Sequence, residues 1–338
     1  MGWLASVMGL AILIVAILAG PGGLTGLALT LGSLLLLSVG LVAASGSQGL
    51  QRRAEAERRW GSEHPNVEPA APAIPEAPWT TVAAPDDVLG IPRATPTPGY
   101  LGPSPFLVFG ASLPITVLAT VAILGPATAA GLDPDGPLAA LISVILTAIV
   151  NIGLVQLLVV STGAMSWTEM GLPRVTLPRA VSDALAGAAL ALPIILVTGV
   201  LANLLVELIG TSPGSPLPPS GGTIGFLFNF VAATVVAPIG EETFYRAFAT
   251  TAWLRAMPPW AAIVRGALFF AFVHVLTVGG TSFADAAPKA LIAFAVRIPV
   301  ALALGWVFVR RRSLYASMGL HGTFNGLILI LGALLPTG

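Results

Sequence analysis

Two adjacent glutamates and an arginine lie in the segment Ala237-Pro-Ile-Gly-Glu-Glu-Thr-Phe-Tyr-Arg246, in a chain that otherwise avoids charge. On a helix, Glu242 and Arg246 are four residues apart and lie on the same face, whereas Glu241 is turned about 100° away. This spacing predicts that Glu242 is held by Arg246 while Glu241 is free to point into a cavity, where it could serve as a general base. The same residues could instead form only an ion pair at an exposed helix end.

Histidines follow in two later apolar segments. His274 ends the motif Phe270-Ala-Phe-Val-His274, and His321 precedes Asn325 by four residues, which places both of those side chains on one helix face. At a rise of 1.5 Å per residue, both histidines lie roughly 10 to 20 Å from the membrane boundary, so they could meet Glu241 in one pocket. A single intramembrane histidine can equally be an interhelical hydrogen-bonding group. An ionisable residue at that depth is costly, and it is therefore a functional candidate.

The composition predicts an all-α, polytopic transmembrane helical bundle. Of 338 residues, 56% are hydrophobic and 9% are charged, and the mean hydropathy is +0.92, whereas soluble domains carry about 25% charged residues. Apolar runs that can cross about 30 Å of hydrocarbon recur along the chain and give about nine spans. They do not alternate as barrel strands do. The zero net charge argues against a nucleic-acid partner, and the absence of cysteine excludes disulfides.

The pattern of apolar runs divides the chain into three regions. Residues 1–46 are predicted to form a transmembrane hairpin, in which Gly40 and Ala44 have the small-xxx-small spacing that allows close helix packing. Residues 47–104 begin with a charged helical turn or two and continue as a Pro-rich, disordered linker. Residues 105–338 form the core, with further spans at about 106–124, 138–160, 181–208, 223–244, 261–278, 290–309 and 314–335.

Arginines gather in alternate connections between these spans, which predicts the orientation of the chain. The loops at 128–136, 210–222 and 279–288 contain no Arg or Lys, whereas the linker and the segment Arg310-Arg-Arg312 are basic. By the positive-inside rule, the N-terminus and the linker are cytoplasmic and the C-terminus lies on the opposite side. The sequence thus predicts an integral protein of the cell membrane, with the bilayer as one of its partners.

The order of the polar motifs resembles that of a known protein family. Glu241-Glu242-xxx-Arg246, Phe270-xxx-His274 and His321-xxx-Asn325, on successive membrane helices, closely resemble the CPBP family of intramembrane glutamic or metal-dependent endopeptidases. This family is also called the Abi family and includes the type II CAAX prenyl proteases. The resemblance covers about residues 166–335 and begins with a polar segment, Trp167-Thr-Glu-Met-Gly-Leu172. Any one of these motifs alone would be weak, but their combination is specific.

The resemblance implies a membrane-embedded hydrolase that cleaves a peptide bond at the cytoplasmic side. Its substrate would be a peptide or a lipidated protein, with prenylated proteins as one option. Glu241 would activate the water that attacks the scissile carbonyl, and Glu242, held by Arg246, would organise the site. His274 would position or polarise the water.

His321 and Asn325 would complete this site, Asn325 as a donor to the developing oxyanion. Glu241, His274 and His321 also form a plausible zinc-binding set, as in a metalloprotease. A metal-free site that uses glutamate as the base is equally consistent with these residues. The sequence therefore leaves open whether the protein needs a divalent metal such as zinc or no cofactor.

A non-catalytic function is the alternative. The chain could be a membrane scaffold, an immunity protein or a transporter with a polar relay, which would use further intramembrane groups such as Asn203 and Arg297. Other chemistries lack their motifs. The sequence contains no His-Glu-xx-His zinc motif, no Gly-xxx-Gly-Asp-like aspartyl pair and no Walker lysine loop.

Overall fold

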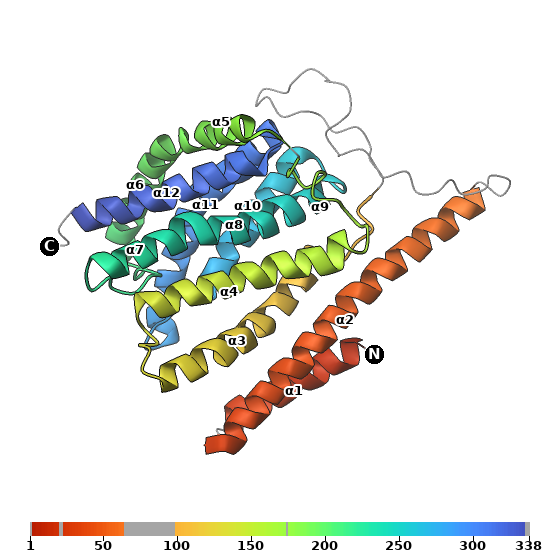
Figure 1. Cartoon of the computed structure of the whole chain (residues 1–338), viewed down its shortest axis with the longest axis horizontal. Helices are drawn as coiled ribbons and strands as arrows, with labels where there is room; N and C mark the ends of the chain where they lie inside the picture. Colours follow the sequence, from red (N-terminus) through yellow and green to blue (C-terminus); the bar gives the residue numbers. More distant parts are fainter. Residues whose placement is uncertain (1, 20–22, 64–98, 174, 335–338) are drawn as a thin grey trace. The chain divides into compact units, whose positions relative to one another are not determined.

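The computed structural model describes residues 2–19, 23–63, 99–173 and 175–334, which contain helices and no strand (Figure 1). Several helices continue into segments with π-helical hydrogen bonding, labelled η. The elements in chain order are α1 (Gly2–Ala19), α2 (Gly23–Glu63), α3 (Pro105–Ala129), α4 (Pro137–Val155), η1 (Gln156–Val160), α5 (Leu177–Ala188), α6 (Ala191–Ile209), α7 (Thr223–Val231), η2 (Ala232–Val236), α8 (Ala237–Glu242), η3 (Thr243–Thr250), α9 (Thr251–Leu254), α10 (Pro259–Val275), α11 (Phe283–Arg311) and α12 (Leu314–Leu334).

The helices confirm the predicted polytopic bundle. Among the described residues, seven helical segments are long and apolar enough to cross a membrane, and two shorter apolar helices, Gly2–Ala16 and Pro259–Val275, accompany them. Each of these segments coincides with one of the predicted spans. The long ones are Thr25–Arg59, Pro105–Ala129, Pro137–Val160, Leu177–Ile209, Thr223–Leu254, Phe283–Arg311 and Leu314–Leu334. The protein is therefore an integral membrane protein.

The chain divides into two compact units. Of the described residues, those up to 63 and those at 99–134 and 145–166 belong to the first unit, and 135–144 and 167–334 belong to the second. All the predicted site residues lie in the second unit. Helix α2 runs without a break past residue 46, where the hairpin region was predicted to end. The Pro-rich part of the predicted linker, residues 64–98, lies outside the described residues.

In the first unit, α1 and α2 pack against each other as the predicted hairpin (Figure 1). A Cβ atom added at Gly40 would lie 2.4 Å from the backbone nitrogen of Ser6, and one at Gly2 would lie 2.6 Å from that of Ala44. These distances are too short for any side chain, so the two backbones touch because the residues at the contact are small. The predicted close approach at Gly40 and Ala44 is confirmed.

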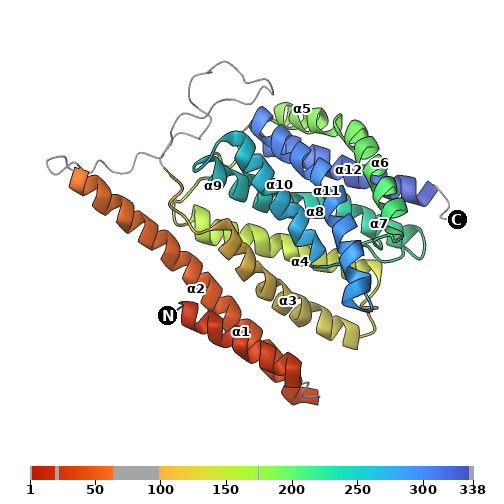
Figure 2. The same ribbon diagram turned by 180° about the vertical axis from the view of Figure 1, so that it is seen from behind.

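In the second unit, α10, α11 and α12 lie side by side and α5 packs along α12 (Figures 1 and 2). The span predicted at 181–208 is interrupted here, because α5 ends at Ala188 and α6 begins at Ala191. Helix α5 exposes large apolar residues at every fourth position, namely Leu177, Val181 and Leu185. This helix is amphipathic, with one apolar face turned outward.

The polar segment before α5 is packed into the second unit rather than exposed. Glu169 is buried and forms an ion pair with the buried Arg255 that follows α9. Met170 is fully buried, and the backbone nitrogen of Leu314 donates a hydrogen bond of 2.8 Å to the carbonyl of Gly171. The segment thus joins the end of α9 to the start of α12. The ion pair resolves the apparent conflict between its polar sequence and its buried position.

Candidate active site

A helix that continues from Thr223 to Leu254 carries the two glutamates on α8, between the π-helical segments η2 and η3. Pro238 has no N–H, so the carbonyls one turn before it lack a helical donor. Asn325 on α12 compensates, since its Nδ2 donates a hydrogen bond of 2.9 Å to the carbonyl of Ala233. Segments of π-helix are frequent at functional sites because they shift side chains out of the regular helical register.

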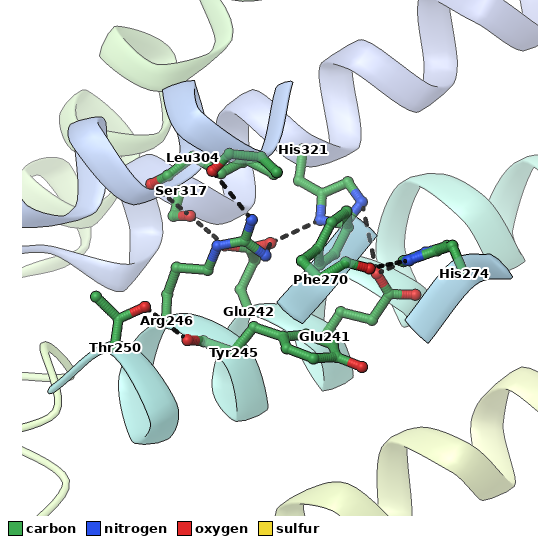
Figure 3. Close-up of polar contacts among 11 residues, drawn as sticks. Glu241, Glu242, Tyr245, Arg246, Thr250, Phe270, His274, Leu304, Ser317 and His321 are labelled. Carbon is green, nitrogen blue, oxygen red and sulfur yellow. Dashed lines mark hydrogen bonds and ion pairs between the residues drawn. The ribbon is translucent and has the colours of Figure 1, made fainter. Parts of the chain in front are cut away.

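Glu242 is fully buried and accepts three hydrogen bonds (Figure 3). Arg246 Nη1 and His321 Nδ1 donate to its Oε1 at 2.9 and 2.8 Å. Ser317 Oγ donates to its Oε2. The predicted pairing of Glu242 with Arg246 is confirmed. A buried carboxylate is tolerated only with such partners, and the bonds that Glu242 accepts commit both of its oxygens to holding neighbouring groups.

Arg246 is also buried, and its remaining contacts fix the guanidinium in place. Nη2 donates to the carbonyl of Ala301 on α11 at 3.4 Å. The guanidinium carbon lies 4.4 Å from the centre of the Phe270 ring, which is a cation–π geometry. Arg246 therefore links Glu242 to both α10 and α11.

Glu241, in contrast, has a carboxylate oxygen, Oε2, without a hydrogen-bond partner among the described residues. Figure 3 shows it facing the imidazoles of His274 and His321. Its Oε2 lies 3.7 Å from His274 Nε2 and 3.9 Å from His321 Nε2, and it accepts no hydrogen bond from any residue in the described part of the chain. These separations are longer than direct hydrogen bonds, so Glu241 Oε2 keeps its lone pairs unused.

The orientation of each histidine is set by its other ring nitrogen. His274 Nδ1 lies 2.7 Å from the carbonyl of Phe270, and because a carbonyl can only accept, Nδ1 carries the hydrogen. The same reasoning applies to His321 Nδ1 and the Glu242 carboxylate. The Phe270 ring packs between them, with its centre 4.4 Å from that of His274 and 5.8 Å from that of His321. Both histidines thus present Nε2 to Glu241.

The structure brings all the predicted site residues except Asn325 into one network, namely Glu241, Glu242, Arg246, His274 and His321. Asn325 instead contacts the backbone of η2, as described above. Two members of the network were not predicted as site residues. Ser317 lies four residues before His321 and so shares its helix face, which is the signal that could have identified it. Phe270, four residues before His274, was noted only as part of a motif.

The predicted metal set of Glu241, His274 and His321 stays a prediction. Among the described ranges, no three or more His, Asp or Glu side chains are grouped so that they could hold a metal ion. Classification as a metalloprotease therefore has no structural support. In the proposed reaction Glu241 acts as the general base.

Gly322 determines how closely α12 approaches this site. A Cβ atom at this position would lie 2.5 Å from the carbonyl oxygen of Thr234, so we expect Gly322→Ala to push α12 away and to displace the neighbouring His321. The expected cost is about 1–3 kcal/mol of stability, the range for overpacking, together with a loss of activity. Gly332→Ala on the same helix is the control, since a Cβ there would meet nothing within 4 Å. Unfolding in detergent measures the stability, and equal stability of the two variants would contradict the prediction.

The helical fold and this network define a membrane-embedded bundle with an acidic, histidine-flanked site. Residues 223–327 match the family described as type II CAAX prenyl endopeptidase Rce1-like. This match confirms the resemblance to the CAAX protease family that was predicted from the sequence. The matched segment contains every predicted site residue, and it begins after the Trp167 to Leu172 segment. No curated protein and no solved structure matches the chain.

Proposed function

We propose that this protein is an intramembrane endopeptidase in which Glu241 activates a water molecule for attack on a peptide carbonyl. The observation that carries the proposal is the contrast between the two glutamates. Glu242 is saturated with donors, whereas Glu241 Oε2 has no hydrogen-bond partner among the described residues and faces the Nε2 atoms of His274 and His321. A general base needs a free lone pair within one water of the proton that it removes.

In the proposed reaction, a water molecule donates one hydrogen to Glu241 Oε2 and the other to Nε2 of a histidine. As the water oxygen bonds to the carbonyl carbon, its proton passes to Glu241 and the carbonyl becomes a tetrahedral oxyanion. Glu241 then gives this proton to the leaving nitrogen, and the carbon–nitrogen bond breaks. The products are a new carboxyl terminus and a new amino terminus. The histidine that accepts from the water does so through an Nε2 lone pair that its Nδ1 contact orients.

Asn325 is proposed to stabilise the oxyanion with its side-chain amide. One N–H of Nδ2 is used by the carbonyl of Ala233. The second N–H of the same nitrogen would donate to the oxyanion. In this proposal the contact with Ala233 also has a positioning role, because it fixes the plane of the amide before the substrate binds.

The proposed substrate is a peptide or a lipidated protein, including prenylated proteins, and the proposed site of cleavage is near the cytoplasmic face. The family match supports this substrate class. The orientation rests on the distribution of arginines, among them Arg310 and Arg311, which are exposed at the end of α11. In this orientation the N-terminus is cytoplasmic.

The experiment compares protein termini in membranes from cells that make the wild-type chain with those from cells that make Glu241→Gln at matched abundance. New termini that depend on Glu241 would establish proteolysis and identify the substrate. Termini that are unchanged, across cells that contain prenylated and other lipidated proteins, would favour the scaffold or transport function. Repeating the comparison with EDTA tests the glutamate mechanism, since loss of cleavage that zinc restores would assign the reaction to a metal.

A further inference from the structure

A cavity of about 410 Å³ opens beside the last turns of α11, at the junction of α5 and α6. Its volume falls within the roughly 300–1,000 Å³ typical of small-molecule sites. It combines apolar side chains with two arginines, and the lining residues are Ala186, Leu190, Trp306, Val307, Arg310 and Arg311.

This cavity is separate from the site around Glu241. On α11, Ala301 faces the site, because its carbonyl accepts a hydrogen bond from Arg246. With about 100° per residue, Trp306 lies roughly 140° and Arg310 roughly 180° around the helix from Ala301. These two lining residues therefore lie on the far face of α11 from Ala301, whereas Arg311 lies roughly 80° around the helix from it.

The lining residues are of types that contact a lipid monolayer. Arg310 and Arg311 are exposed in the last turn of α11. Trp306 lies about 6 Å further along the helix axis, at 1.5 Å per residue, and it is partly buried beside Val307 and Leu190. The cavity thus combines arginines at the end of α11 with tryptophan and aliphatic side chains, the residue types that contact the headgroups, the interface and the acyl chains of a bilayer.

The rim of the cavity has an excess of positive charge. Asp183 on α5 is paired with both Arg311, at 3.1 Å, and Arg179, at 3.4 Å, so two guanidinium groups share one carboxylate. Arg310 is among the residues that line the cavity itself. A phosphate group would complement this arrangement, because it can accept charge-assisted hydrogen bonds from two guanidinium groups at once.

The surface next to the cavity indicates that the occupant comes from the bilayer. Leu177, Val181 and Leu185 form the exposed apolar face of α5, with 77%, 47% and 64% of their surface accessible. Such a face is stable in hydrocarbon rather than in water. The cavity thus opens beside lipid chains, and a free soluble anion would have no contact with its apolar wall.

We propose that this cavity binds one anionic glycerophospholipid, with the phosphate at Arg310 and Arg311 and an acyl chain along Leu190, Trp306 and Val307. This site has no catalytic role in the proteolysis proposed above, and its test does not depend on proteolytic activity. The lipid would join the α5–α6 junction to α11 at the membrane surface.

The test measures retention of phosphatidylglycerol by the detergent-purified full chain, using native mass spectrometry with phosphatidylcholine as the comparison lipid. Arg310→Gln should weaken retention of phosphatidylglycerol about five- to tenfold, the effect of one lost charge-assisted contact. Arg312→Gln is the matched control. It removes the same charge two residues away, from a side chain that does not line the cavity, and it should change retention about twofold or less.

Each other outcome bears directly on the proposal. Equal losses in Arg310→Gln and Arg312→Gln would show only general attraction to a basic surface and would overturn it, as would equal retention of the two lipids by the wild type. Ala186→Trp should fill the apolar part and reduce retention while both arginines remain. If inorganic phosphate displaces the lipid equally from the wild type and from Ala186→Trp, the acyl chain does not contribute to binding, and that part of the proposal is contradicted.

Discussion

Replacing Glu241 by glutamine is expected to lower kcat by about 10²–10⁴-fold, the usual contribution of a general base, while leaving the unfolding transition unchanged. Glutamine has nearly the shape of glutamate but cannot accept the proton of the attacking water. Glu241 Oε2 accepts no hydrogen bond within the described part of the chain, so the substitution breaks no structural contact there. Turnover of a peptide substrate in proteoliposomes, together with thermal unfolding in detergent, measures the two effects separately.

Glu207→Gln is the matched control for this variant. Glu207 is an exposed glutamate on α6, also within a candidate membrane span, and it lies outside the network around Glu242. The same chemical change there should leave kcat near the wild-type value. If Glu241→Gln kept more than about a tenth of the wild-type rate, another group would be the base. A loss of activity accompanied by a lower unfolding temperature would instead assign Glu241 a structural role.

The parts of the fold and site that depend on local spacing could be predicted from the sequence. The spans follow from runs of apolar residues, whose length is set by the thickness of the bilayer. The pairing of Glu242 with Arg246 follows from a separation of four residues on one helix. The meeting of His274 and His321 with Glu241 required only that the three lie at similar depth on neighbouring helices.

The features that the sequence did not predict depend on contacts between distant segments. Ser317 donates to Glu242 across 75 residues of chain, and its position on the helix face of His321 indicates a face but not this distant partner. At the π-helical segment η2, before Glu241, Pro238 removes a backbone donor and Asn325 supplies one from another helix. The burial of Glu169 depends equally on Arg255, which hydropathy alone cannot place beside it.

Glu242→Ala and Arg246→Ala are each expected to destabilise the protein by about 3–5 kcal/mol, because each leaves a buried charge without its partner. In both variants activity should also fall, since Glu242 accepts the hydrogen bond that orients His321. The double variant should cost less than the sum of the single ones by about 1–3 kcal/mol. Unfolding free energies of the four proteins in detergent give this coupling.

The partly exposed pair Asp285 and Lys289 on α11 provides the control cycle. Its carboxylate and ammonium lie 2.6 Å apart at the same spacing of four residues, but the side chains are 32% and 26% exposed, whereas those of Glu242 and Arg246 are almost completely buried. Water can replace either partner of an exposed pair, so its coupling should be much smaller than that of the buried pair. The two pairs have the same helical spacing and opposite charges, and they differ in burial and in side-chain type. If the costs of Glu242→Ala and Arg246→Ala were additive, the two residues would not act as one unit, and His321 would have to be held in place by other contacts.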